Sequence, residues 1–121
     1  MKTHKDLEVW VMSINYVSDI YKLTDSFPKT ELYTLTSQIR RSAISIPSNI
    51  AEGSARGSYK EFTRFLYIVL GSLTELETQL IIASNLQFAA IDDQYFNQLT
   101  TIKKMILGLI RSIKNKMVNG E

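Results

Sequence analysis

Few residues in this chain could carry acid–base or metal chemistry. Its 121 residues include one histidine, His4, and no cysteine. A catalytic triad would have to use His4, which we expect to lie in a mobile N-terminal segment. Zinc sites built on nitrogen or sulfur ligands need more of these side chains than the sequence holds. The paired Glu-x-x-His motifs of di-iron proteins are excluded for the same reason, and no glycine-rich phosphate loop is present. We therefore predict no metal centre and no cofactor.

Carboxylates are the remaining candidates for acid–base catalysis. They are Glu52, Glu75, Glu77, Asp92 and Asp93. Glu75 and Glu77 stand two residues apart in a predicted helix, so their side chains point to different faces. With so few reactive groups, we predict that the protein is not an enzyme and expect no small-molecule substrate.

Basic side chains offer a different chemistry, the binding of phosphate groups. The net charge of +2 is too small to indicate nucleic acid by itself, but the basic residues fall into groups. The first group is Arg40, Arg41, Arg56 and Lys60. It could surround a groove for phosphates, with Tyr59 placed for base stacking. The alternative is a solvated helix face on which Glu52 forms an ordinary ion pair with Arg56 or Arg64.

The second basic group lies near the C-terminus, where residues 94–120 include no acidic side chain. Four of its members share one broad side of a predicted helix: Lys103, Lys104, Arg111 and Lys114. In a ring of subunits this side would be repeated as a basic belt, which would bind the phosphate backbone of a nucleic acid. Here too the alternative is a solvated helix face.

Four segments repeat apolar residues every three or four positions, the period of an amphipathic helix. We expect helices over about residues 5–25, from Pro28 to a break at residues 53–57, from Ser58 to about residue 84, and from Asp92 or Asp93 to about residue 119. Long helices with short connections predict an all-α, antiparallel up-down-up-down four-helix bundle. The length fits one domain over residues 1–121.

A proline interrupts the second predicted helix. Proline in a helix removes a backbone donor and crowds the carbonyl four residues earlier, at a cost of about 3 kcal/mol, so we expect a kink at Pro47. Asn49 and Glu52 are expected to satisfy backbone groups around the kink and the helix end, and Gly53 to permit a left-handed turn. We interpret these four residues as a structural motif and not as a binding site.

The segment from Ser37 to Arg56, SQIRRSAISIPSNIAEGSAR, resembles the signature of the 23S rRNA-intervening sequence proteins. Residues 6–10 (DLEVW), 62–66 (FTRFL) and 71–77 (GSLTELE) extend the resemblance over most of residues 6–85. It implies a bacterial four-helix bundle assembled as a ring-shaped homopentamer. It also implies RNA or DNA nearby, because these proteins are encoded within insertions in ribosomal RNA genes and a similar bundle serves retroelements that diversify protein sequences.

The first predicted helix is apolar on two sides. The row expected to face the core is Leu7, Trp10, Val11, Ile14, Val17 and Tyr21. The opposite row is Val9, Met12, Tyr16, Ile20 and Leu23. A bundle helix needs one apolar face, so we predict that copies of the chain cover this second row together with Tyr67, Leu70 and Ile81 of the third helix. The alternative is scattered surface hydrophobes.

The chain begins without the apolar run of a signal peptide, and no apolar segment approaches the ~18 residues of a membrane span. We therefore expect a cytoplasmic protein without a membrane partner. The leading functional hypothesis is a non-enzymatic homo-oligomer that binds RNA or DNA through repeated basic surfaces. The rival hypothesis is a structural or protein-interaction scaffold without affinity for nucleic acid.

Overall fold

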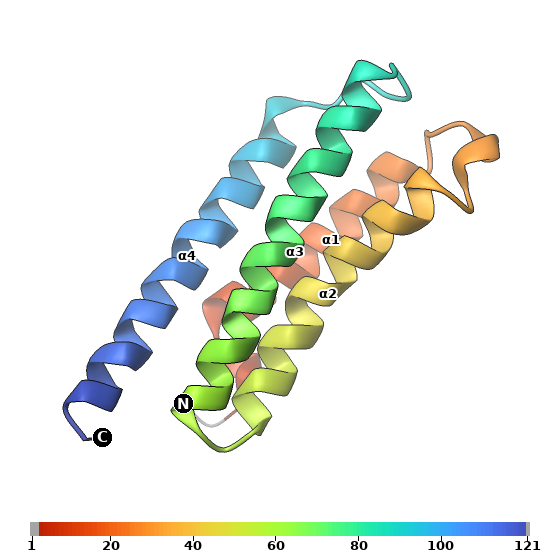
Figure 1. Ribbon diagram of the computed structural model, residues 1–121. Coiled ribbons are helices and arrows are strands. Elements are labelled where there is room, and N and C mark those ends of the chain that lie inside the picture. Colours follow the sequence, from red (N-terminus) through yellow and green to blue (C-terminus); the bar gives the residue numbers. More distant parts are fainter. Residues whose placement is uncertain (1–2, 121) are drawn as a thin grey trace.

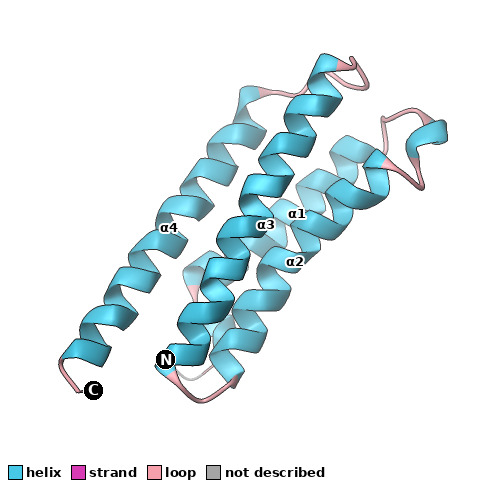
Figure 2. Ribbon diagram, viewed as in Figure 1, coloured by secondary structure: helices cyan, strands magenta, loops and turns pink. Residues whose placement is uncertain are grey.

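The protein is built from four long α-helices in a computed structural model that describes residues 3–120 (Figures 1 and 2). The helices are α1 (Glu8–Thr24), α2 (Leu35–Ala55), α3 (Tyr59–Asn85) and α4 (Asp93–Val118), and two 3₁₀ turns, η1 (His4–Asp6) and η2 (Lys29–Glu31), precede α1 and α2. No strand occurs within residues 3–120. The predicted all-α, four-helix architecture is therefore confirmed.

The helices lie side by side, and successive helices are neighbours in space. Figure 1 shows the α1–α2 and α3–α4 connections at one end of the molecule, with the α2–α3 connection at the other end. The contact between α2 and α3 is the most extensive, and α1 also touches α4. Buried apolar residues from all four helices form one core, which includes Ile20, Ile46, Leu66 and Ile106.

Two predicted helix starts are confirmed by their caps. The hydroxyl of Ser58 accepts a hydrogen bond from the backbone N–H of Glu61 at 3.1 Å. A carboxylate oxygen of Asp92 accepts one from the backbone N–H of Gln94 at 2.9 Å. Both side chains satisfy donors that the first turn of a helix leaves without a partner.

The predicted start of the second helix at Pro28 is wrong, because α2 begins at Leu35. Phe27 is buried, but Leu32 and Tyr33 are exposed. Residues 29–34 form η2 and a turn instead of a continuous helix. An apolar face that packs against nothing gives little stability to a helical turn, so the apolar period of the sequence extended further than the helix does.

The predicted orientation of the first helix is also wrong, because the row assigned to an oligomer interface is the one that enters the core. Half of the row assigned to the core, Leu7, Trp10 and Val17, is half-buried against that core. Four members of the row assigned to an oligomer interface are buried within the subunit: Val9, Tyr16, Ile20 and Leu23. Met12 is half-buried against the core. In the row assigned to the core, Val11, Ile14 and Tyr21 are exposed. Both rows are apolar, so periodicity alone could not choose between them.

A hydrogen bond helps to explain which row faces inward. The side chain of Tyr16 is 1% exposed, and its hydroxyl donates to the backbone carbonyl of Tyr95 in α4 at 2.8 Å. A buried tyrosine needs such an acceptor. Burial, reinforced by the nearby Tyr95, Asp19 and Glu77, raises the pKa of the Tyr16 phenol well above its usual range.

Replacing Tyr16 by phenylalanine is expected to lower the free energy of unfolding by about 1–2 kcal/mol at neutral pH, because the Tyr95 carbonyl loses its donor. In the unfolded chain the Tyr16 phenol ionises near pH ~10. Because the pKa of the phenol is higher in the folded state, its contribution to the free energy of unfolding is fully present below about pH 10. That contribution is lost as the pH rises towards the folded-state pKa. The Tyr16→Phe variant should therefore lose less stability between about pH 9 and 11.

Urea unfolding at about pH 9 and at about pH 11 measures the loss of stability in the wild type and in Tyr16→Phe. Tyr33→Phe is the matched control, because Tyr33 is exposed. Equal loss of stability in the wild type and in Tyr16→Phe would contradict the role given to this phenol.

The four residues of the motif in α2 make different contacts. The side-chain amide of Asn49 donates to the backbone carbonyl of Ser45 at 2.8 Å. Glu52 instead accepts from the Arg56 guanidinium at 2.8 Å. Gly53 lies inside α2 and makes no left-handed turn; that conformation belongs to Gly57, with φ of 79°. α2 continues through Pro47, which is buried.

Small residues let α2 and α3 approach closely. A Cβ atom added at Gly53 would lie 2.6 Å from Cβ of Phe65, so only glycine fits there without movement. Further along, the hydroxyl of Ser45 lies 2.6 Å from that of Ser72, in hydrogen-bond contact. The close contact of the two helices therefore requires small side chains at Gly53, Ser45 and Ser72.

By length and composition, α3 is the one helix in residues 3–120 that could cross a membrane, with a mean hydropathy of 1.4 over its most apolar window. In this fold one side of α3 lines the core, whereas Tyr67, Ile68, Ile81 and Ile82 are exposed. Phe62, Leu66, Leu73 and Leu80 are all buried, and α3 packs against both α2 and α4. A core helix passes the same compositional test as a membrane span.

Candidate nucleic-acid interface

The C-terminal basic group lies on the surface of α4. Lys103, Lys104, Arg111 and Lys114 are all exposed. Within the described chain, the first three form no ion pair or side-chain hydrogen bond, so their positive charges face solvent. From Lys103 to Lys114 the four residues span about 16 Å of helix, and successive steps of one, seven and three residues keep them on one broad side.

Lys114 joins this group to α3. Its ammonium donates a hydrogen bond to the hydroxyl of Tyr67 at 2.7 Å and lies 5.1 Å from the centre of the tyrosine ring. Lys60 stands seven residues before Tyr67, on the same side of α3. We call this surface the α3–α4 face: Lys60, Tyr67, Lys103, Lys104, Leu107, Arg111 and Lys114.

The structure thus separates the members of the first basic group. Lys60 belongs to the α3–α4 face, whereas Arg40 and Arg41 lie on α2. Arg40 donates to Thr24 at 2.8 Å and to Asp25 at 3.0 Å, and its guanidinium lies 4.5 Å from the centre of the Tyr21 ring. These contacts hold α2 against the end of α1, so Arg40 has little capacity left for phosphate.

Arg56 is also engaged within the subunit. It pairs with Glu52 at 2.8 Å, as the solvated-face alternative expected, and covers the ring of Phe65 at 5.0 Å. Arg64 covers the same ring at 4.7 Å and pairs with Glu61 at 3.0 Å. Its hydrogen bond lowers the pKa of the Glu61 carboxyl. Because these pairs are exposed, they are weak and salt-sensitive.

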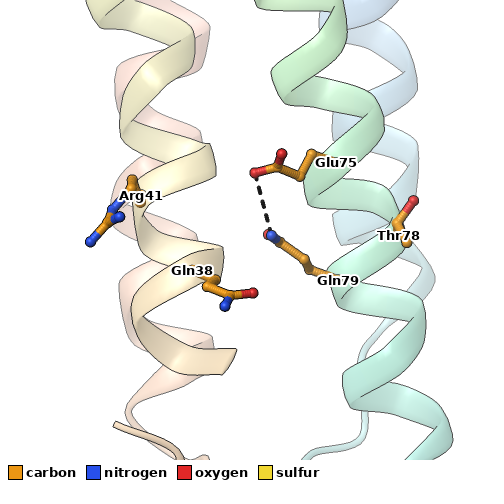
Figure 3. Close-up of a pocket in the computed structure, with 5 residues that line it drawn as sticks. All are labelled: Gln38, Arg41, Glu75, Thr78 and Gln79. Atoms are coloured by element: carbon orange, nitrogen blue, oxygen red, sulfur yellow. Dashed lines mark hydrogen bonds between the residues drawn. The ribbon is translucent and has the colours of Figure 1, made fainter. Parts of the chain in front are cut away.

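A polar cleft of about 500 Å³ lies on the other side of α3, against α2 (Figure 3). Its lining residues are Gln38, Arg41, Glu75, Thr78 and Gln79. The buried hydroxyl of Ser42 lies 2.8 Å from the Glu75 carboxylate and 2.9 Å from the Gln79 amide oxygen. Figure 3 shows Arg41 pointing away from Glu75. Glu75 is thus held by hydrogen bonds from Ser42 and Gln79.

Metal-ligating side chains do not gather in the part of the chain that the structure describes. No group of three or more His, Asp or Glu residues there could hold an ion. The chemistry that the surface supports is electrostatic, through the unpaired cations of the α3–α4 face.

The sequence did not predict that two residues lie beside these cations, and the assignment of Tyr67 to an oligomer interface stays a prediction. Tyr67 was assigned to an oligomer interface, and its contact with Lys114 joins positions 47 residues apart, so no local pattern could reveal it. Leu107 did carry a signal, because it stands four residues after Lys103 and four before Arg111. Among the other interface candidates on α3, Ile81 is exposed and Leu70 is half-buried against the core.

The fold and this surface define a four-helix protein with one basic side. The chain belongs to the 23S rRNA-intervening sequence protein family, whose profile matches residues 5–108. This match confirms the resemblance and extends it into α4. A comparison with curated proteins finds none that matches the chain.

Proposed function

We propose that the protein is a non-enzymatic, homo-oligomeric, up-down-up-down four-helix bundle that binds RNA or DNA through its α3–α4 face. The observation that carries this proposal is the set of three exposed, unpaired cations on α4, Lys103, Lys104 and Arg111, beside Lys114. Phosphate contacts by lysine and arginine supply most sequence-independent affinity for nucleic acid. The membership of a family named for ribosomal RNA insertions agrees with such a partner.

Binding of duplex DNA and structured RNA across a salt series tests the proposal, with the mass of the protein measured in the same buffers. Each phosphate contact to a duplex contributes about −0.9 to the slope of log affinity against log salt. We expect a slope of roughly −3 or steeper for each bound subunit. An oligomer that binds neither nucleic acid at low salt would overturn the proposal and favour the scaffold function.

A groove between α1 and α2 supports self-association and, with it, the scaffold function as the second candidate. It measures about 400 Å³, and its apolar lining is Trp10, Ile14, Val17, Ile44, Pro47 and Ala51. A second hollow shares Ile44 and continues towards Tyr21 and Leu32. We propose that a second copy of the chain covers this α1–α2 groove, because exposed apolar side chains in a continuous row mark interfaces.

The pentameric state that the family resemblance implies, and a bend of α2 at Pro47, belong to the same proposal. Pro47 lines the groove, so a bend there would set the shape that a second copy meets.

Replacing Ile44 by glutamate is expected to reduce the mass of the assembly to that of smaller species, because a charge would be buried in the interface. Ile44 is 42% exposed in the subunit, so the helical content should be unchanged. Light scattering and circular dichroism measure the two properties. Pro47→Ala should weaken assembly as well, if the bend shapes the groove.

Ile68→Glu is the matched control, since Ile68 is equally exposed but lies on α3, outside the groove. Dissociation by Ile68→Glu, with no change in Ile44→Glu, would place the interface elsewhere.

A further inference from the structure

We infer that the α3–α4 face binds single-stranded nucleic acid in preference to duplex, with an unpaired base stacked on the ring of Tyr67. This inference rests on the proposed nucleic-acid function and concerns the same surface. The ligand is an unpaired base on a phosphodiester backbone, which single-stranded RNA and single-stranded DNA both provide.

The ring of Tyr67 is accessible where it stands. The residue is 47% exposed. The Lys114 ammonium lies much nearer to its hydroxyl, at 2.7 Å, than to its ring centre, at 5.1 Å. The cation therefore holds the hydroxyl end of the ring and leaves ring surface open to a base. A base stacked there would have this cation beside its own phosphate.

The rings of Tyr21 and Phe65, which also lie next to basic residues, are already covered. Arg40 lies over Tyr21, and both Arg56 and Arg64 lie over Phe65, which is 6% exposed. These guanidinium groups occupy the ring faces that a base would use. Tyr67 differs because its cation binds at the edge of the ring.

A second apolar contact lies among the cations of α4. Leu107 is 40% exposed and stands one helical turn from Lys103 and one from Arg111. A protein surface that binds a duplex through its phosphates contacts charged and polar groups along the whole length of the duplex. Tyr67 and Leu107 instead place apolar surface between cations, which suits bases that have left the helical stack.

Tyr67→Leu separates stacking from simple charge attraction. The probes are labelled oligo(U) and oligo(dT) strands of about 15 nucleotides and a DNA duplex of about the same length. We expect the wild type to bind the single strands more tightly. One stacked base is worth about 1–3 kcal/mol, so Tyr67→Leu should lower single-strand affinity by roughly 5- to 150-fold. Duplex affinity should change by less than about twofold, because the phosphate contacts remain.

Two variants control the measurement. Tyr67→Phe keeps the ring but removes the hydroxyl that Lys114 contacts, so it should retain most single-strand affinity. Tyr33→Leu removes another exposed tyrosine, which lies before α2 and away from α4, and should leave binding unchanged.

The outcomes distinguish this inference from the proposed function. A loss confined to oligo(U) assigns the stacking site to RNA, and a loss confined to oligo(dT) assigns it to DNA. An equal fall in single-strand and duplex affinity in Tyr67→Leu would overturn the stacking site but leave nucleic-acid binding intact. A loss in Tyr33→Leu alone would place stacking beside α2. Failure of the wild type to bind any probe at low salt would overturn both.

Discussion

Replacing Lys103, Lys104, Arg111 and Lys114 together by glutamine is expected to lower the affinity for duplex nucleic acid by at least roughly a hundredfold at ~0.1 M salt. Each cation that neutralises a phosphate releases a counterion, and near ~0.1 M salt each release changes affinity by close to tenfold. Lys114 also contacts Tyr67. We therefore expect a smaller fall in affinity than four independent phosphate contacts would give together. The salt slope should become shallower by about 3.

All four side chains are exposed, so the fold should survive the replacement. The matched control is a second fourfold variant with the same change in net charge, placed outside the α3–α4 face: Lys22→Gln, Lys29→Gln, Arg41→Gln and Lys116→Gln. These side chains are exposed as well. An equal loss of affinity in the control would show that net charge, and not this face, attracts nucleic acid.

Replacing Gly53 by alanine is expected to lower the free energy of unfolding by about 1–3 kcal/mol, although alanine is the better helix former. The added Cβ would meet Cβ of Phe65 at 2.6 Å and Cδ1 of Phe62 at 3.1 Å. The Cβ of Phe65 cannot turn aside as the end of a flexible side chain can, so α2 and α3 must move apart. A chain of this length should then melt roughly 4–12 °C lower.

Gly71→Ala is the control for this substitution. Gly71 also lies inside a helix, but an added Cβ there meets nothing within 4 Å. Its replacement should therefore stabilise the protein by about 0.5–1 kcal/mol through helix propensity alone. If both variants gained stability in thermal melts, the close contact at Gly53 would be refuted.

The local sequence determined the number of helices and most of their boundaries. Eight apolar residues of α3 follow the helical period, and each of them is buried: Phe62, Phe65, Leu66, Val69, Leu73, Leu76, Leu80 and Ala83. Ser58 and Asp92 marked the starts of α3 and α4 because their side chains satisfy first-turn donors, a property of a few neighbouring residues. Signals of this kind are local, so they can be read without knowing the fold.

Only the tertiary structure decided which apolar row of α1 faces the core, because that choice depends on what the other helices offer each row, including the acceptor in α4 for Tyr16. It also gave Gly53 its role, since the nearest atoms belong to another helix. The same limit applied to the candidate site. The sequence identified the cations of α4, but the place of Tyr67 beside Lys114 and the engagement of Arg40 with α1 are contacts between distant positions. A chain's periodicity specifies which residues share a helix face, whereas the packing of helices determines what that face meets.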